Sequence, residues 1–195
     1  MNEPAAQTTE VPDPKRRAFL DQSYRERVRG FWWSIVRFTL FRWSPTAFNA
    51  WRRSLLRLFG ARIHRTAVVA PSVRIDFPWN LQIASDVVIV HGAIVNCMGT
   101  IAIGRGTRIS RYAHLCAGTH DYTSRDMRII RCPITIGRNV WIAADAFVGP
   151  GVTIGDGVLL AARSSAFRDL PPGQICIGEP AQPHRPWTDN PTAKA

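Results

Sequence analysis

The stretch LCAGTHDYTS, residues 115–124, places one histidine, His120, after a run of small residues and just before a polar segment. Because the unperturbed pKa of imidazole is about 6.5, such a side chain can accept a proton at neutral pH and later return it to a leaving group. An ordinary histidine at the hinge of a solvated loop would look the same. His120 is therefore a candidate general base whose role depends on the elements that position it.

The other reactive side chains form no recognisable site. Four cysteines (Cys97, Cys116, Cys132 and Cys176) show neither CxxC nor paired spacing, which fits a reducing compartment. The five histidines do not show the spacing of a zinc site, so we expect no metal. The sequence has no glycine-rich phosphate cradle, so phosphoryl transfer from a nucleotide is not supported.

The net charge of +11 is concentrated in one segment. Residues 15–65 hold 13 Arg or Lys against two acids, whereas the rest of the chain holds 12 of each. The same segment contains four tryptophans in stretches such as FWWSIVRFTLFRW. Arginines interrupt it too often for the roughly 20 apolar residues of a membrane-spanning helix. We therefore expect residues 15–60 to form a basic, aromatic helical arm.

Three interpretations of this arm remain open. It could lie on an anionic membrane, where aromatic rings favour the headgroup level and each basic side chain adds about 1 kcal/mol. Its aromatic side chains could instead pack against the main domain while its arginines are solvated. Nucleic-acid binding is the weakest of the three, because no recognised motif accompanies the charge, and we expect no nucleic-acid partner.

From residue 61 a six-residue repeat begins. Units such as IHRTAV, VAPSVR and IDFPWN start at residues 63, 69 and 75, and further sets of three begin at 83 and 103. The sets recur every 20 residues, which is three sixes plus two inserted residues. After a break, five units follow without a slip from residue 136 to residue 165. The first place is always Ile, Val or Leu, and the fifth is usually small.

A six-residue period matches neither a helix nor a long alternating strand, and it indicates a short strand and a tight turn, repeated. Three units make one coil, and coils stacked about 4.8 Å apart pair their strands in parallel. We therefore predict an all-β fold, a parallel β-helix over residues 61–170. The break holds charged residues that cannot all face a core, so residues 119–133 are expected to protrude as a loop.

The repeat, together with the motifs LFRWSP, APSVRIDFPWNL, LCAGTHDY, PGVTIGDG, ARSSAFRDLPP and GEPA, resembles the hexapeptide-repeat acyltransferases. Within that superfamily the chain is most similar to the colanic acid biosynthesis acetyltransferase group, from about residue 38 to residue 187. The resemblance implies that the β-helix is left-handed, which periodicity alone does not show.

The resemblance also implies transfer of an acetyl group from acetyl-CoA to a sugar hydroxyl. His120 occupies the place of the family's catalytic histidine, at the end of a third six-unit and before the protruding loop. In the family this loop reaches the neighbouring subunit and covers the cleft between the two. A homotrimer with three sites at its interfaces is therefore implied. None of the four cysteines matches a nucleophile position, so direct transfer is expected, without an acetylated enzyme.

Four positions match the family's cofactor sites. Ala144 and Ala162 correspond to small residues that line the pantetheine groove, although corners of the repeat also require small residues. Arg168 and Arg185 correspond to cationic residues that meet the nucleotide phosphates, a use to which an arginine fork is suited.

The acceptor side is less defined. His91 and Asn96 are weak acceptor-site candidates, because the sugar-acetylating relatives carry Asn or Asp in that stretch and this chain reads VIVHGAIVNCM. Trp141 corresponds to an aromatic side chain that borders the active-site channel, and it could equally be a packing residue.

The predicted organisation is a tail at 1–14, the arm at 15–60, the β-helix at 61–170 and a C-terminal tail at 171–195. The predicted function is an O-acetyltransferase for a sugar of an exopolysaccharide or its lipid-linked precursor, and the predicted location is the cytoplasm, where the arm contacts the inner face of the membrane. Two alternatives remain: acetylation of a small soluble acceptor such as a free sugar, serine or an antibiotic, and a non-catalytic β-helix scaffold.

Overall fold

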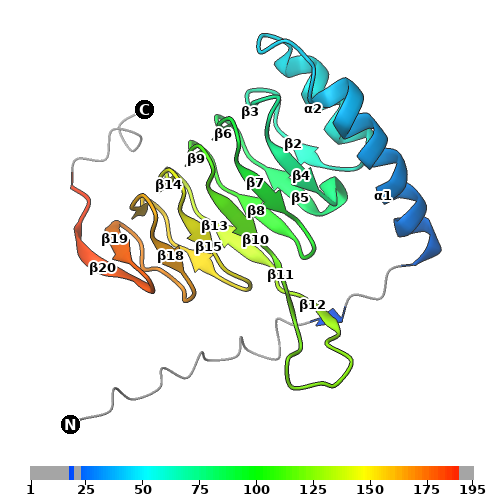
Figure 1. Cartoon of the computed structure of the whole chain (residues 1–195). Coiled ribbons are helices and arrows are strands. Elements are labelled where there is room, and N and C mark those ends of the chain that lie inside the picture. The colour runs from blue at the N-terminus through cyan, green and yellow to red at the C-terminus, as the bar shows by residue number, and fades with distance from the viewer. Residues whose placement is uncertain (1–17, 20–22, 189–195) are drawn as a thin grey trace.

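The computed structural model describes residues 18–19 and 23–188. The predicted tail at 1–14 therefore lies outside the described residues. From residue 62 the chain winds into stacked coils whose short strands form three parallel sheets, with two helices at one end and a projecting hairpin (Figure 1). The fold class predicted from the sequence, a parallel β-helix with an N-terminal helical arm and a protruding loop, is confirmed.

Each coil contributes one strand to each sheet. Sheet 1 contains β2 (Arg62–Ile63), β5 (Leu81–Ile83), β8 (Ile101–Ile103), β13 (Ile134–Ile136) and β16 (Thr153–Ile154). Sheet 2 contains β3 (Val68–Val69), β6 (Val88–Ile89), β9 (Arg108–Ile109), β14 (Trp141–Ile142), β17 (Leu159–Leu160), β19 (Gln174–Gly178) and β20 (Ala181–Pro186). Sheet 3 contains β4 (Arg74–Asp76), β7 (Ile94–Asn96), β10 (His114–Cys116), β15 (Phe147–Val148) and β18 (Ser165–Ala166).

The strand register explains the two sequence periods. In the early coils, partners lie 20 residues apart, as in Ile63 opposite Ile83, whereas in the later coils they lie 18 apart, as in Ile136 opposite Ile154. The two extra residues fall where sheet 3 passes to sheet 1, which we call corner 3–1. The 3₁₀ turn η3 (Pro78–Asn80) lies there in the first coil. The turn between sheets 2 and 3 is called corner 2–3.

The interior of the coils is the hydrophobic core. Residues at the first place of each repeat unit point inward and are buried, including Ile75, Ile89, Ile109, Leu115, Ile142 and Leu160. Small residues at the fifth place, such as Ala93 and Ala113, are also fully buried, at the corners. Burial of an Ile or Leu side chain stabilises the fold by about 1.5–3 kcal/mol, so the regular repeat alone provides a continuous core.

The protruding loop is an antiparallel hairpin. It replaces corner 3–1 of the third coil and consists of β11 (Gly118–His120) and β12 (Ile129–Arg131). A short strand near the N-terminus, β1 (Ala18–Phe19), pairs antiparallel with the outer side of β12. The hairpin is thus tied at its root to residues that precede the arm's first helix.

The arm consists of α1 (Tyr24–Val36), a π-helical turn η2 (Arg37–Phe41) and α2 (Asn49–Leu58). Ser23 caps α1, because its side-chain oxygen accepts a hydrogen bond from the Glu26 backbone N–H. Between η2 and α2 the chain turns, so that both helices lie against the first coils (Figure 1). Trp33, Phe41, Leu55 and Leu56 are buried in this contact.

The arm also covers an open edge of backbone. The first coil has no preceding strand to pair with, and its outward carbonyl groups would lack donors. Side chains of the arm supply them. The pairs are Arg57 to the Ile63 carbonyl, Arg53 to Ala67, Arg52 to Val69 and Trp33 to Ile75, at 2.7–3.1 Å.

These contacts separate two parts of the arm. The arginines of α2 and the buried aromatic side chains cap the β-helix, which is the packing interpretation. A second set of apolar side chains is exposed, and it includes Phe31, Trp32, Phe38, Leu40, Trp43, Phe48, Trp51 and Leu58. Among the described residues, no helix is both long and apolar enough to cross a bilayer.

The β-helix continues beyond the predicted boundary at residue 170. Leu170 bridges to Ile154, and β19 extends sheet 2 by pairing parallel with β17. β20 then folds back antiparallel on β19 and ends the sheet. Within the segment expected as a tail, residues 174–178 and 181–186 therefore form strands of sheet 2, while 189–195 lie outside the described residues.

Candidate active site

His120 is the last residue of β11, opposite Ile129 of β12, and its side chain is exposed. Its Nδ1 lies 2.7 Å from the carbonyl oxygen of Met127. Since a carbonyl oxygen can only accept, Nδ1 carries the proton and donates, and the lone pair of Nε2 is left to accept another proton. Met127, in the turn that closes the hairpin, has a left-handed backbone conformation with φ 46°.

The hairpin that carries His120 is fixed to the arm by charge. Arg131 at the end of β12 binds both carboxylate oxygens of Glu26 on α1, at 3.0 and 3.2 Å. Both side chains are about three-quarters buried, with 22% and 25% exposure. Together with the pairing of β1 and β12, this ion pair sets the position of the hairpin relative to the body of the chain.

The free thiols near the hairpin do not offer a nucleophile. Burial raises the pKa of Cys116, which lies at the end of β10, and raises the pKa of Cys97 strongly. A thiol held protonated is a poor nucleophile. This agrees with the expectation of direct acetyl transfer.

Three of the predicted residues share corner 2–3. His91, Ala144 and Ala162 occupy this corner in the second, fourth and fifth coils, and all are exposed. The corners of adjacent coils are hydrogen-bonded to each other, as where the Arg163 backbone N–H of the fifth coil donates to the Ala144 carbonyl oxygen of the fourth at 3.0 Å. His91 is held by a hydrogen bond between its Nδ1 and the Ser72 hydroxyl, 2.9 Å away in the first coil.

Trp141 lies beside this corner. It begins β14 on the outer face of sheet 2, and its indole N–H donates to the Ser110 hydroxyl at 2.9 Å. Its ring centroid is 6.3 Å from that of Trp187, which follows β20. The side chain thus borders the corner that carries Ala144 and Ala162.

Asn96 lies at the other edge of sheet 3. It ends β7, in register with Asp76 and Cys116, and its side-chain oxygen Oδ1 is buried without a hydrogen-bond partner among the described residues. His91 lies in the turn of corner 2–3 before β7 begins, whereas Asn96 ends β7, so this strand lies between them. The two weak acceptor candidates therefore do not form one cluster within a chain.

The two predicted phosphate-binding arginines are also apart. Arg168 follows β18 at corner 3–1, and Arg185 lies on β20 opposite Ile175 of β19. Both are exposed. Arg185 accompanies Trp141 on sheet 2, and Arg168 lies on the side of the hairpin.

The predicted residues thus fall into two groups. His91, Trp141, Ala144, Ala162 and Arg185 lie at corner 2–3 or on sheet 2. Asn96, His120 and Arg168 lie at corner 3–1 or on the hairpin that leaves it. Sheet 3 lies between the two groups in one chain.

Some features of the site were not expected from the sequence. A backbone carbonyl such as that of Met127 has no sequence signal, because every residue carries one. An ion pair of Glu26 could have been predicted from the sequence, since Glu26 is one of only two acidic residues in the basic segment 15–65. Within the described part of the chain, no three His, Cys, Asp or Glu side chains gather closely enough to hold a metal ion.

The parallel coils, the projecting histidine hairpin and the small residues along one corner define a hexapeptide-repeat β-helix protein. Residues 133–165 match the family described as bacterial transferase hexapeptide (six repeats). The chain is 45% identical over 150 residues to the putative colanic acid biosynthesis acetyltransferase WcaF of Escherichia coli (strain K12), covering 77% of this chain and 82% of that protein.

Two more distant relatives are also acetyltransferases. Galactoside O-acetyltransferase of Escherichia coli (strain K12) is 29% identical, with coverage of 71% of this chain and 70% of that protein. A crystal structure of a hexapeptide-repeat acetyltransferase from Vibrio cholerae, complexed with acetyl coenzyme A, superposes with a TM-score of 0.77 at 26% identity, covering 90% of this chain and 96% of that one. The chain belongs to the hexapeptide-repeat acetyltransferase family, and the prediction of an acetyltransferase is confirmed.

Proposed function

We propose that this acetyltransferase uses acetyl-CoA to acetylate a sugar hydroxyl of an exopolysaccharide or its lipid-linked precursor, with His120 as the general base. The observation that carries the proposal is the hydrogen bond from His120 Nδ1 to the Met127 carbonyl oxygen, 2.7 Å long. It holds the imidazole in the tautomer whose Nε2 accepts a proton. The relative of colanic acid biosynthesis supports a polysaccharide acceptor.

The reaction follows from this tautomer. As the sugar hydroxyl attacks the acetyl carbonyl carbon of the thioester, its proton passes to Nε2 of His120. The tetrahedral intermediate then breaks its C–S bond and expels the thiolate of coenzyme A. The imidazolium returns the proton to this sulfur, so the products are an acetyl ester and coenzyme A. Met127 stabilises the transient imidazolium through the same carbonyl.

The test is coenzyme A release across a panel of sugars and lipid-linked oligosaccharides, with acetyl-CoA binding measured in parallel. We expect His120→Ala to lower kcat by about 10²–10⁴ because it removes general-base catalysis, while acetyl-CoA binding is retained. His64→Ala is the control, since His64 is an exposed histidine in a turn away from the hairpin. Wild-type turnover that survives in His120→Ala would refute the base assignment.

We also propose a homotrimer as the active form. His120 and the cofactor positions Ala144 and Ala162 lie at opposite edges of sheet 3, so the hairpin of one chain would complete the groove of its neighbour. The mass in solution should then be three times 21.8 kDa. A monomer that is fully active would contradict this arrangement.

Complementation tests the shared site more directly. His120→Ala removes the base, and Ala162→Trp fills the exposed corner 2–3 where the cofactor groove is expected. Each variant alone should be inactive. Mixed, unfolded and refolded together, the two should form trimers in which some interfaces combine an intact hairpin with an intact corner, and activity should return. Activity that stays absent in verified mixed trimers would place the site within one chain.

The exposed apolar side of the arm supports peripheral membrane contact, which a lipid-linked acceptor would require. Vesicles of phosphatidylcholine with phosphatidylglycerol provide the test by flotation. Phe31→Ser/Trp32→Ser, which removes two exposed rings of α1, should reduce flotation. Phe167→Ser/Ile177→Ser is the matched control, because these exposed apolar residues lie at the opposite end of the β-helix. Equal flotation of the two double variants would refute the contact.

A further inference from the structure

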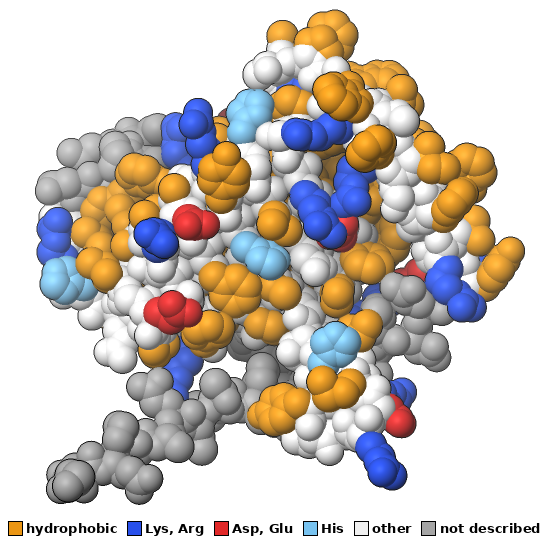
Figure 2. Space-filling view, viewed as in Figure 1, with side chains coloured by type: hydrophobic (Ala, Val, Ile, Leu, Met, Phe, Trp, Pro, Cys, Tyr) orange, Lys and Arg blue, Asp and Glu red, His pale blue; other side chains and the backbone are white. Residues whose placement is uncertain are grey.

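A hollow of about 290 Å³ lies where the arm meets the first coil. Three arginines line it, Arg37 and Arg42 from the arm and Arg74 from β4, together with Ser72. Figure 2 shows arginine side chains, in blue, close together on this face of the molecule, beside the apolar side chains of the arm.

The charge in the hollow is not balanced by the protein. Arg37 and Arg74 both bind the carboxylate of Asp76, the latter through Nε at 3.2 Å. Among the described residues, Asp76 is the only carboxylate within ion-pair distance of the three arginines. The cluster therefore keeps a net charge of +2. Arginine forks match phosphate oxygens in geometry as well as in charge.

The hollow lies on the same corner as the expected cofactor groove. Ser72, at corner 2–3 of the first coil, binds His91 in the second coil. Ala144 follows in the fourth coil, about 14 Å from the first coil at the usual strand spacing. An anionic group in the hollow would thus lie at the end of the corner opposite to the cofactor. A sugar attached to it would extend past His91 toward the middle of the corner.

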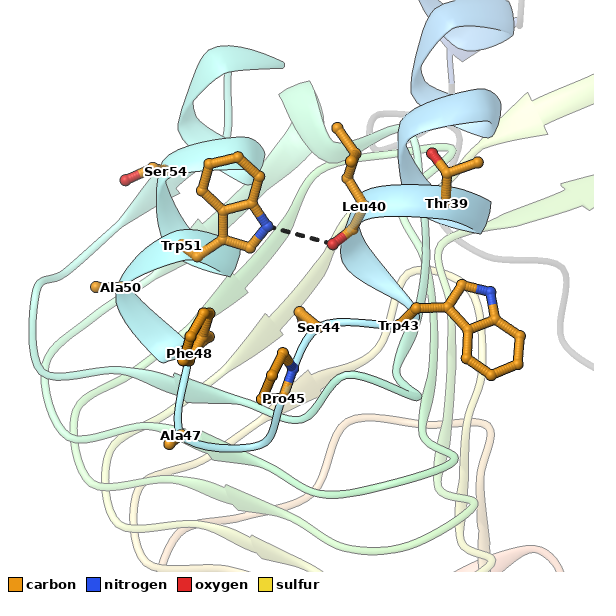
Figure 3. Close-up of a pocket in the computed structure, with 10 residues that line it drawn as sticks. All are labelled: Thr39, Leu40, Trp43, Ser44, Pro45, Ala47, Phe48, Ala50, Trp51 and Ser54. Atoms are coloured by element: carbon orange, nitrogen blue, oxygen red, sulfur yellow. Dashed lines mark hydrogen bonds between the residues drawn. The ribbon is translucent and has the colours of Figure 1, made fainter.

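An apolar groove of about 860 Å³ adjoins the hollow. Only the π-helical turn η2 separates them, because Arg37 and Phe41 line the hollow while Thr39 and Leu40 line the groove. Figure 3 shows Leu40, Phe48 and Trp51 around the groove, with the Trp51 indole N–H bound to the Leu40 carbonyl at 3.2 Å. Trp43 at its rim is 77% exposed.

We propose that the arginine hollow binds the diphosphate of a lipid-linked sugar, while the hydrocarbon chain of that lipid lies in the neighbouring groove. The proposal rests on the proposed function, because it identifies the acceptor as the lipid-linked precursor and not as the finished polysaccharide. The charge supports a diphosphate. A diphosphate diester carries two negative charges and matches the net +2 of the cluster, whereas the phosphodiester of a phospholipid carries one.

The test uses farnesyl diphosphate below its micelle concentration, with inorganic pyrophosphate and phosphatidylglycerol vesicles as separate probes, all on the full chain. Arg42→Gln/Arg74→Gln removes two exposed arginines of the hollow, one from the arm and one from the first coil. Arg27→Gln/Arg65→Gln is the matched control, with the same loss of charge from the same two elements but away from the hollow.

We expect farnesyl diphosphate to bind the wild type and the control within two-fold of each other. Binding to Arg42→Gln/Arg74→Gln should be at least ten-fold weaker. Trp43→Ser should weaken farnesyl diphosphate binding but leave pyrophosphate binding unchanged. Equal weakening in both double variants, no binding of farnesyl diphosphate, or an effect of the hollow variant on vesicle binding alone would each overturn the proposal.

A failure here is distinguishable from a failure of the proposed function. Coenzyme A release with a soluble sugar acceptor that carries no phosphate reports acetyl transfer without using the hollow. If this release depends on His120 while farnesyl diphosphate does not bind, the diphosphate site is refuted and acetyl transfer stands. If acetyl-CoA itself does not bind, the acetyl-transfer proposal fails whatever farnesyl diphosphate does.

Discussion

Arg52 provides the most direct test of how the arm holds the β-helix. Its side chain is fully buried, and all five of its N–H donors are used. Nε donates to the Val69 carbonyl of β3, and the two terminal nitrogens donate to acceptors in residues 44–49, at 2.6–2.9 Å. Burial, and secondarily the neighbouring Arg53, lowers the pKa of Arg52, so the site stabilises the charge only through these bonds.

The effect of Arg52→Met can be worked from these contacts. The Val69 carbonyl would be left buried without a donor, at a cost of about 1–3 kcal/mol. The other four acceptors lie on a partly exposed turn and regain water, so each loses only about 0.5 kcal/mol. Part of this sum is offset, because Arg52→Met also removes the free-energy cost of burying the guanidinium charge. We expect a loss of about 3 kcal/mol, which for a chain of this size lowers Tm by roughly 6–12 °C.

The assay is thermal unfolding by circular dichroism at fixed protein concentration, since assembly would make Tm concentration-dependent. Arg53→Met is the matched control. Arg53 makes one described bond, to the Ala67 carbonyl at 3.0 Å, and its Nε is buried without a partner. It should cost only about 1 kcal/mol. If Arg52→Met melts within about 2 °C of the wild type, or together with Arg53→Met, the five hydrogen bonds of Arg52 do not stabilise the fold as described.

Three further predictions concern other parts of the fold. Burial, and secondarily the neighbouring Arg74, lowers the pKa of His114 in the folded chain. Below about pH 6.5 the unfolded chain therefore binds more protons than the folded chain, and the stability from the neutral ring is lost as pH falls through this value. His114→Gln should lose less Tm than the wild type between pH 7.5 and 5.5, and equal losses would contradict this. Glu26→Gln breaks the pair with Arg131, so amide exchange should accelerate in residues 118–131 but not in the coils, and unchanged exchange would show that β1 alone anchors the hairpin. Thr107→Val leaves the Gly137 carbonyl without its hydroxyl donor and the buried Val140 N–H without its hydroxyl acceptor, and should cost about 2 kcal/mol in urea unfolding, whereas a neutral effect would mean that the corner adjusts.

The repeat made the body of the fold predictable. An aliphatic residue at every sixth position requires an interior that recurs every sixth residue, and only a short strand and a turn satisfy this. The insertion of two residues per early coil was visible as the 20-residue period. The hairpin was predictable as a break in the rhythm, because its charged residues could not continue the core.

The packing of the arm could not be predicted in this way. Its arginines look alike in the sequence, yet Arg52 is buried against β3 while Arg42 lies exposed beside the hollow. The difference depends on which carbonyl groups of the first coil lack a strand partner, and this is known only when the coil is closed. The composition therefore left membrane contact and packing open, and the structure assigns packing to one face of the arm.

The sequence by itself determined the coil, its core and the position of His120 before the hairpin, because these depend on local spacing along one strand and one turn. Only the tertiary structure decided the rest: the tautomer of His120, the pairing of Glu26 with Arg131, and the separation of the predicted residues onto two edges of sheet 3. Each of these joins segments far apart in the chain, and backbone carbonyls and stacked corners leave no mark in the spacing of side chains. For the same reason the sequence does not predict the cluster of Arg37, Arg42 and Arg74, which forms only where the arm folds back onto the first coil.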